Sequence, residues 1–160
     1  MQVKCKCLTY AAAAPWQRKQ RLAKDTSVGA WHAGVSDRVV DIIDDDESVR
    51  RALWRLLNSV GVESRTYGSA RSYLDSADWE SADCLLLDLH LPEMPGIELL
   101  EHLREVAPNL HVICMTGRDE PEIAQRLAAA GITECLRKPF DQAELFAALA
   151  SVMAGSEFLT

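Results

Sequence analysis

The stretch from Cys84 to Pro92, with the sequence CLLLDLHLP, decides how this chain folds. A short uninterrupted apolar run of this kind is typical of a strand buried on both faces inside a parallel sheet. Such a strand delivers the residue at its carboxyl end into the crevice where open α/β sheets bind ligands. Here that residue is Asp88. The stretch alone leaves two roles open for Asp88: a cap of the following helix, or a member of a binding site.

Length and composition indicate one ordinary globular domain. The chain has 160 residues, of which 48% are hydrophobic and 26% are charged. No apolar run approaches the roughly 20 residues that a membrane-spanning helix needs. We therefore expect no membrane partner.

Charge divides the chain into two parts. Residues 1–37 carry six Lys/Arg and two acids, whereas residues 38–160 carry eleven Lys/Arg and twenty-two acids. An acidic body has no electrostatic footprint for nucleic acid, so we expect no direct DNA binding by this domain. Residues 1–37 also lack a sustained apolar stripe, which predicts a disordered N-terminal extension. The domain itself is expected at residues 38–154, followed by a short C-terminal tail at 155–160.

The five cysteines point to packing and not to a metal site or disulfides. Cys84, Cys114 and Cys135 fall in apolar runs, where a free cysteine behaves as a small hydrophobic residue. Cys5 and Cys7 have no Cys or His nearby at zinc-site spacing. This usage fits a reducing, cytoplasmic location.

From residue 38 onward, strand and helix patterns alternate five times. Apolar runs predict strands at 39–43, 62–67, 83–88, 110–115 and 132–136. The second of these is the most polar and is expected at a sheet edge. Helical patterns follow each strand, and the last two begin near Pro121 and Asp141. This alternation implies an α/β fold with a parallel sheet, helices on both faces and right-handed crossovers.

Helix ends carry recognisable signals. Gly61 and Gly131 stand where a C-terminal cap belongs, and Asp141 and Glu144 have the spacing of a capping box. These signals predict where individual helices begin or end.

Four of the predicted strands end in polar residues of distinct chemistry. These are Asp44 with Asp45, Asp88, Thr116 and Lys138. Parallel strands bring them to one edge, where two carboxylates ~4 Å apart repel by about 4 kcal/mol at an effective dielectric near 20. Lys138 supplies one balancing charge, and a Mg²⁺ ion held by hard oxygen ligands is the natural second source. A metal, a lysine and a hydroxyl around a carboxylate suit transfer of a phosphoryl group onto that carboxylate.

The same motifs, in the same order and spacing, closely resemble the receiver domain of bacterial two-component response regulators. The resemblance covers about residues 38–154 and implies a flavodoxin-like doubly wound sheet of five strands in the order 2-1-3-4-5. The part from Glu93 to Leu100 most resembles receivers of LuxR-type transcription regulators. The motifs that carry the resemblance are Ile43–Arg51, Leu87–Gly96, Thr116–Gly117 and Lys138–Phe140.

The resemblance assigns roles to matching positions. Asp88 would be the phosphoacceptor, taking the phosphoryl group from a phosphohistidine of a sensor histidine kinase or a phosphotransfer protein. Asp45, Asp88 and the backbone carbonyl of His90 would hold Mg²⁺, with Asp44 acting through a coordinated water. The side chain of His90 occupies a variable position that tunes phosphoryl lifetime in relatives, and we expect no further role for it.

Three more positions complete the implied switch. Lys138 and Thr116 would contact oxygens of the attached phosphoryl group, and the Lys138–Pro139 peptide is expected to be cis. Relatives usually carry an aromatic residue three positions before the lysine, and here that position is Cys135. The switch is therefore expected to depend on Thr116 and its loop. Residues 120–154 would then form a phosphorylation-dependent homodimer.

Two alternatives stay open at this point. The domain could be a fragment of a longer DNA-binding transcription regulator instead of a single-domain protein. It could also be a phosphatase with an aspartate nucleophile, although such enzymes carry a second aspartate where this chain has His90.

Overall fold

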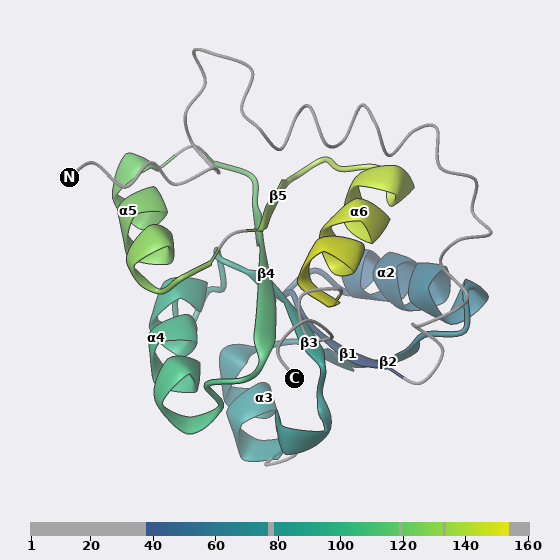
Figure 1. The fold of residues 1–160 in the computed structure, drawn as a ribbon, viewed down its shortest axis with the longest axis horizontal. Helices are drawn as coiled ribbons and strands as arrows, with labels where there is room; N and C mark the ends of the chain where they lie inside the picture. The colour runs from purple at the N-terminus through teal and green to yellow at the C-terminus, as the bar shows by residue number, and fades with distance from the viewer. Residues whose placement is uncertain (1–37, 77–78, 119, 133, 154–160) are drawn as a thin grey trace.

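The computed structural model describes residues 38–76, 79–118, 120–132 and 134–153 (Figure 1). The five described strands form one parallel sheet in the order β2-β1-β3-β4-β5. The predicted fold class and strand order are confirmed, whereas the extensions at 1–37 and 155–160 lie outside the described residues. The strands are β1 (Val39–Ile43), β2 (Glu63–Tyr67), β3 (Cys84–Asp88), β4 (His111–Thr116) and β5 (Cys135–Arg137).

Helices cover both faces of this sheet (Figure 1). Helices α2 (Glu47–Ser59) and α6 (Gln142–Met153) lie on one face. On the other face lie α3 (Ala70–Ser76), α4 (Gly96–Val106) and α5 (Pro121–Ala129), while the short 3₁₀ helix η2 (Trp79–Ser81) leads into β3. Among the described helices, none has the length and apolarity needed to span a membrane.

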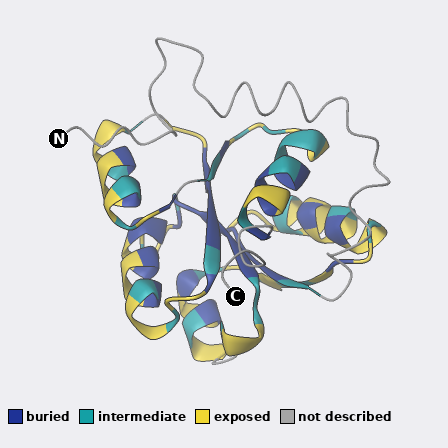
Figure 2. Cartoon of the chain, viewed as in Figure 1, coloured by how far each residue is buried: buried dark blue, intermediate teal, exposed yellow. Residues whose placement is uncertain are grey.

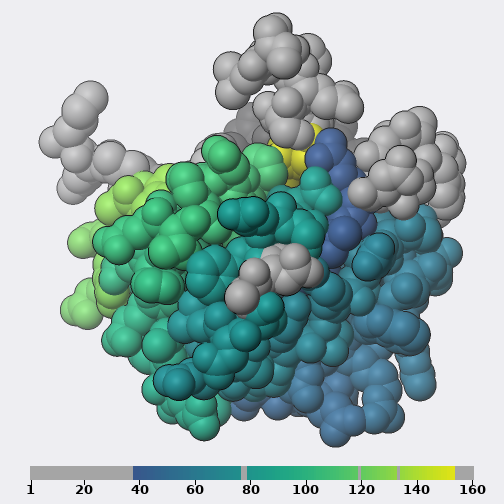
Figure 3. Space-filling view, turned by 90° about the horizontal axis from the view of Figure 1, so that it is seen from below, coloured from purple at the N-terminus to yellow at the C-terminus, as the bar shows by residue number. Residues whose placement is uncertain are grey.

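The core has two halves, one on each face, because side chains alternate along each strand. In β3, Leu85 and Leu87 join the cluster under α3, α4 and α5, whereas Leu86 joins the cluster under α2 and α6. All five residues of β3 are buried, as predicted for a strand inside a parallel sheet. Figure 2 shows the buried positions along the strands and on the inward faces of the helices. In the space-filling view, green, teal and blue segments of the chain lie next to one another across one face (Figure 3).

β2 forms an edge of the sheet, as its polar sequence predicted. Its Arg65 reaches inward to the fully buried Asp41 of β1, with Nε and Nη2 donating to the two carboxylate oxygens at 2.7 and 2.9 Å. A buried carboxylate needs such a partner, and the two-pronged contact ties the edge strand to its neighbour.

The predicted helix-end signals are present in the structure. Gly61 and Gly131 adopt φ angles of 80° and 74°, the left-handed region that glycine favours at a helix C-terminus. At the start of α6, Asp141 N–H donates to Glu144 Oε2 at 2.8 Å and Glu144 N–H donates to Asp141 Oδ1 at 2.9 Å. This reciprocal pair is the predicted capping box.

The predicted bounds of the fifth strand were wrong. We expected residues 132–136, but β5 spans Cys135–Arg137. Ile132 instead completes the end of α5, because its N–H donates to the carbonyl oxygen of Leu127 at 3.0 Å and its side chain is buried in the core beside that helix. An apolar residue just after a helix satisfies the same hydrophobic pattern as the first residue of a strand, so the pattern could not separate the two.

Candidate functional site

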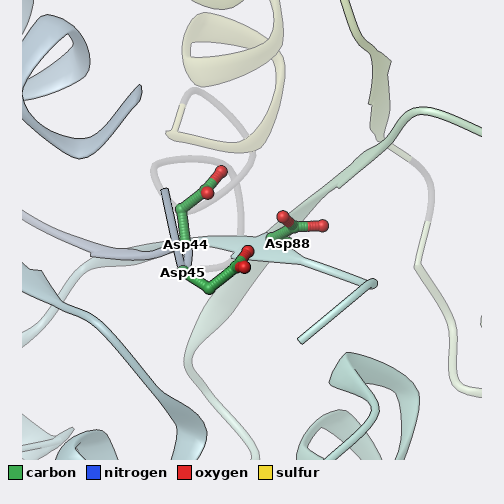
Figure 4. A group of neighbouring side chains, drawn as sticks. All are labelled: Asp44, Asp45 and Asp88. Carbon is green, nitrogen blue, oxygen red and sulfur yellow. The ribbon is translucent and has the colours of Figure 1, made fainter. Parts of the chain in front are cut away.

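Three consecutive acids follow β1, and each has a different environment. Asp44 is fully buried, and its Oδ1 accepts a hydrogen bond from Asp46 N–H at 2.9 Å. Asp46 caps α2 by accepting from Ser48 N–H at 2.7 Å. Asp45 is exposed, yet it offers a carboxylate oxygen within 4.8 Å of one from Asp44 and one from Asp88 (Figure 4). The loop thus directs two carboxylates to the site and uses the third to start the helix.

Asp88 ends β3 at the same edge of the sheet. Its side chain is buried, and its Oδ1 accepts a hydrogen bond from His90 N–H at 2.9 Å. It does not cap α4, whose N-cap is Pro95 with no side-chain hydrogen bond. A Cβ atom on Gly96 would lie 2.4 Å from the carbonyl oxygen of Asp88, so only glycine allows the helix to begin this close to the strand end. The structure therefore places Asp88 in the acidic cluster and not in a capping role.

Lys138 reaches the site from the loop after β5. Its Nζ donates to Asp44 Oδ2 at 2.6 Å and to Asp88 Oδ2 at 2.9 Å. Its backbone N–H donates to the carbonyl oxygen of Thr116 at 2.8 Å, which joins the ends of β4 and β5. The peptide bond to Pro139 is cis, as expected. One ammonium group therefore contacts two of the three clustered carboxylates.

Burial and pairing oppose each other in setting the charges here. Burial raises the pKa of Asp44, and the hydrogen bonds from Lys138 and from the backbone of Asp46 only partly offset it. For Lys138, burial alone would lower the pKa, but the bonds to Asp44 and Asp88 outweigh it, so the pKa lies above its ordinary value. Lys138 consequently keeps its proton at neutral pH and serves as a fixed positive charge.

The cluster also fits a divalent cation. With the carboxylates of Asp44, Asp45 and Asp88 ionised, Lys138 leaves two negative charges uncompensated. These groups are hard oxygen ligands, and one oxygen from each lies within 4.8 Å of the others. Mg²⁺ prefers such ligands and is commonly held by only a few carboxylates, with its remaining positions open to water or phosphate oxygens. The donor set therefore suits the predicted ion.

Thr116 ends β4 beside this cluster, with its side chain buried. Its hydroxyl donates to the carbonyl oxygen of Arg118 at 3.0 Å and accepts from the N–H of Arg118 at 3.1 Å. A ring nitrogen of His90, Nε2, lies 3.1 Å from the same hydroxyl oxygen. The structure thus brings Thr116 to the predicted edge and adds a contact with the His90 side chain that sequence reasoning missed.

A second residue missed from the sequence is Arg50, in the first turns of α2. Its Nη1 donates to the carbonyl oxygens of Asp44 and Asp45 at 2.7 and 3.0 Å. The guanidinium group therefore holds the backbone of the acidic loop. Its position a few residues after the acids was the only available signal, because nothing in the local pattern shows where an arginine side chain turns.

Cys135 is the first residue of β5. It is partly buried and packs against the core cluster under α5. The position expected to carry an aromatic switch residue is therefore filled by a small side chain that belongs to the core.

Comparison with known proteins agrees with this geometry. The model of the response regulator receiver domain family matches residues 40–150, a span that contains every candidate site residue. FixJ, a transcriptional regulatory protein of Azorhizobium caulinodans, is 34% identical over 117 residues, which cover 73% of this chain and 56% of FixJ. The response regulator protein TodT of Pseudomonas putida is 31% identical over 121 residues, which cover 74% of this chain and 53% of TodT. The chain thus spans about half the length of these relatives, which are regulators of the predicted LuxR type.

Solved structures show the same likeness. A response regulator receiver protein from Burkholderia phymatum is 34% identical, with a TM-score of 0.64, over 73% of this chain and 95% of that one. A CheY-like receiver domain from Methanospirillum hungatei is 26% identical, with a TM-score of 0.71, over 75% of this chain and 96% of that one. The matched family is a signalling domain and not a catalytic one, so the match at residues 40–150 does not support the phosphatase alternative for this domain. The match over residues 40–150, together with the acidic cluster that they contain, establishes that the chain belongs to the response regulator receiver domain family.

Proposed function

We propose that Asp88 is the residue of this receiver that accepts the phosphoryl group. The observation that carries the proposal is the position of Lys138, whose Nζ lies 2.9 Å from Asp88 Oδ2 and 2.6 Å from Asp44 Oδ2. A carboxylate oxygen of Asp88 attacks the phosphorus of a phosphohistidine, and the new O–P bond forms as the P–N bond breaks. The electron pair of the P–N bond passes to the released ring nitrogen, and the ring leaves as neutral imidazole because its other nitrogen already carries a proton. Lys138 stays protonated and stabilises the charge on the phosphoryl oxygens.

The acidic cluster of Asp44, Asp45 and Asp88 is typical of the Mg²⁺ site of receivers. In this chain we propose that Asp45, Asp88 and the backbone carbonyl of His90 bind the ion directly, with Asp44 acting through a coordinated water. When bound, Mg²⁺ supplies the positive charge that Lys138 alone does not provide. Arg50 supports this arrangement by holding the two carbonyl groups of the acidic loop.

Thr116 provides the link from chemistry to conformation. Once a phosphoryl group is attached to Asp88, the hydroxyl gains a new acceptor, and donating to it requires leaving the carbonyl oxygen of Arg118. This difference in contacts separates the two states, as any ligand-driven change requires. The loop after Thr116 leads into α5, so we propose that residues 120–154 form the surface that responds. A weak homodimer through that surface is the expected consequence, because Cys135 offers no aromatic side chain to strengthen the switch.

The source of the phosphoryl group and the process that the receiver controls are also proposals. We propose that the phosphoryl group comes from a sensor histidine kinase or a phosphotransfer protein in the cytoplasm. FixJ, of which the chain spans about half the length, is a transcriptional regulatory protein, so control of transcription within a longer regulator is the alternative output. The receiver itself keeps the acidic character that argues against direct contact with nucleic acid.

Labelling with a small phosphodonor tests the central proposal. In the presence of Mg²⁺ and acetyl phosphate, mass spectrometry is expected to show one added phosphoryl group, which hydroxylamine removes. Asp88→Asn should abolish it, because an amide is a poor nucleophile. Asp83→Asn is the matched control, since Asp83 lies at the opposite end of β3 and pairs with Arg38 at 2.9 Å. Full labelling of Asp88→Asn, or loss of labelling in Asp83→Asn, would contradict the assignment.

A further inference from the structure

The side chain of His90 connects three parts of the signalling site. Its Nε2 lies 3.1 Å from Thr116 Oγ1, the hydroxyl at the end of β4. The same nitrogen lies 3.9 Å from Oε1 of Glu120, the residue that immediately precedes α5. His90 itself follows β3 by two residues. One partly buried ring thus spans from the strand that carries the phosphoacceptor to the hydroxyl and to the start of the responding helix.

The hydrogen bonds around Thr116 fix the direction of this contact. A hydroxyl has one proton to donate. Thr116 gives that proton to the carbonyl oxygen of Arg118 at 3.0 Å and accepts from the N–H of Arg118 at 3.1 Å. With the hydroxyl proton engaged in this way, the contact assigns His90 as the donor, with a proton on Nε2, and Thr116 as the acceptor. The hydroxyl oxygen then accepts from two donors, and its own proton is engaged with the carbonyl oxygen of Arg118.

We propose that His90 is a positioning residue that holds Thr116 in its resting orientation and so sets the free-energy cost of switching. This inference rests on the proposed function of Asp88 and Thr116. To donate to a phosphoryl oxygen, the hydroxyl must release the carbonyl oxygen of Arg118. This role of His90 requires that the Oγ1 atom moves in this step, so that the bond from His90 is lost or weakened. His90 therefore stabilises the resting state relative to the phosphorylated one. Its place near Glu120 lets the same ring restrain the start of α5.

The sequence context makes such a restraint useful. Cys135 is a small core side chain at the position where an aromatic would report the state of the switch. The structure supplies a different aromatic side chain, the His90 imidazole, which approaches Thr116 from the β3 side. Because a ligand shifts a two-state equilibrium only by its differential contacts, removing a contact made only in the resting state favours the active state.

Titration with beryllofluoride and Mg²⁺ tests whether the contact from His90 to Thr116 stabilises the resting state. His90→Leu removes the donor and keeps a side chain of similar bulk, so it should bind beryllofluoride about fivefold more tightly, the value of one ordinary hydrogen bond of about 1 kcal/mol. His90→Gln places an amide N–H near the position of Nε2 and should return the affinity to that of the unaltered protein. His102→Leu, on the exposed face of α4, is the matched control and should leave the affinity unchanged.

A double-mutant cycle isolates the contact itself. In a Thr116→Val background, which lacks the accepting hydroxyl, His90→Leu should produce no further change in beryllofluoride affinity. The proposed role of His90 would be overturned if His90→Leu alone left the affinity for beryllofluoride unchanged or weaker. It would also be overturned if His90→Leu raised that affinity equally in the Thr116→Val background.

The ring nitrogens give a readout that needs no phosphoryl mimic. ¹⁵N chemical shifts of the free protein should show a proton on His90 Nε2, and Thr116→Val should relax that preference. A proton on Nδ1 would overturn the inference. Failure of the unaltered protein to bind beryllofluoride, with the Nε2 proton present, would instead count against the proposed function of Asp88 and leave the resting contact established.

Discussion

At the scale of single residues, Asp44 is the carboxylate of the site whose charged form is destabilised by burial. Its carboxylate is fully buried and depends on Lys138 and the Asp46 N–H for its hydrogen bonds. Burial penalises the charged form, so the pKa of Asp44 is raised above its ordinary value of 3.8. The folded protein therefore binds this proton more strongly than the unfolded chain does.

The pH dependence of stability follows from that shift. An acid whose pKa is raised on folding contributes stability that is fully present below its unfolded pKa and is lost as pH rises through the folded pKa. Without Mg²⁺, the unaltered protein should therefore lose stability relative to Asp44→Asn as the pH rises from 4 to 8. Thermal melts in EDTA measure this loss as a difference in Tm between the two proteins, which should move in favour of the variant as the pH rises. A difference that is constant, or that moves the other way, would contradict the burial argument.

The element that most closely constrains the site is α4, because its first turn packs on the strand end that carries Asp88. Gly96 makes this approach, and its N–H donates to the carbonyl oxygen of Leu89 at 3.1 Å. A Cβ atom at this position would meet the backbone of Asp88 at 2.4 Å and of Leu89 at 2.8 Å. No rotation of a side chain relieves such contacts, so the helix or the strand end would have to move.

Gly96→Ala is therefore expected to lower the free energy of unfolding by about 1–3 kcal/mol, the usual cost of overpacking. The sign of this change in unfolding free energy distinguishes a clash from its absence, because alanine in a helix without a clash would stabilise the protein by up to about 1 kcal/mol. Gly117→Ala is the control, since a Cβ there meets nothing within 4 Å, and it should change stability by less than about 0.5 kcal/mol. Urea unfolding of both variants makes the comparison, and equal effects would count against the close-packing argument.

At the scale of the whole molecule, the sheet gathers groups that are far apart in the chain. Lys138 contacts Asp44 and Asp88 across 94 and 50 residues of sequence. The same edge carries Thr116, from which the chain continues into α5. The proposed signal from Asp88 to the surface of residues 120–154 would pass through this strand end and the loop that follows it.

Dimerisation of the receiver domain tests the proposed signal from Asp88 through Thr116 to residues 120–154. With beryllofluoride and Mg²⁺, sedimentation velocity is expected to show weak, partial dimerisation that is absent without the mimic. Thr116→Val should remove the dependence on the mimic, because it lacks the hydroxyl that is proposed to contact the phosphoryl oxygens. An unchanged mass would favour a monomeric relay, whereas a mimic-dependent dimer that survives Thr116→Val would rule out coupling through Thr116.

Much of the fold and the membership of the candidate site could be predicted from the sequence. The apolar runs that end in Asp44, Asp88 and Thr116 predicted three strands of a parallel sheet, whose topology then brings those residues to one edge. Gly61 and the capping box at Asp141 marked helix ends correctly. These features succeed because each depends on a local pattern: the period of apolar residues, a backbone angle, or a hydrogen bond within one turn.

Only the tertiary structure decided the contacts between distant side chains. The His90 ring meets Thr116 across 26 residues, and Arg65 meets Asp41 across 24. Ile132 joined the end of α5 instead of β5 because a buried helix end and a buried strand both accept an apolar residue. Local periodicity specifies which face of an element is buried, but the partner of a polar side chain depends on how the elements pack, and that is settled only when the whole sheet has formed.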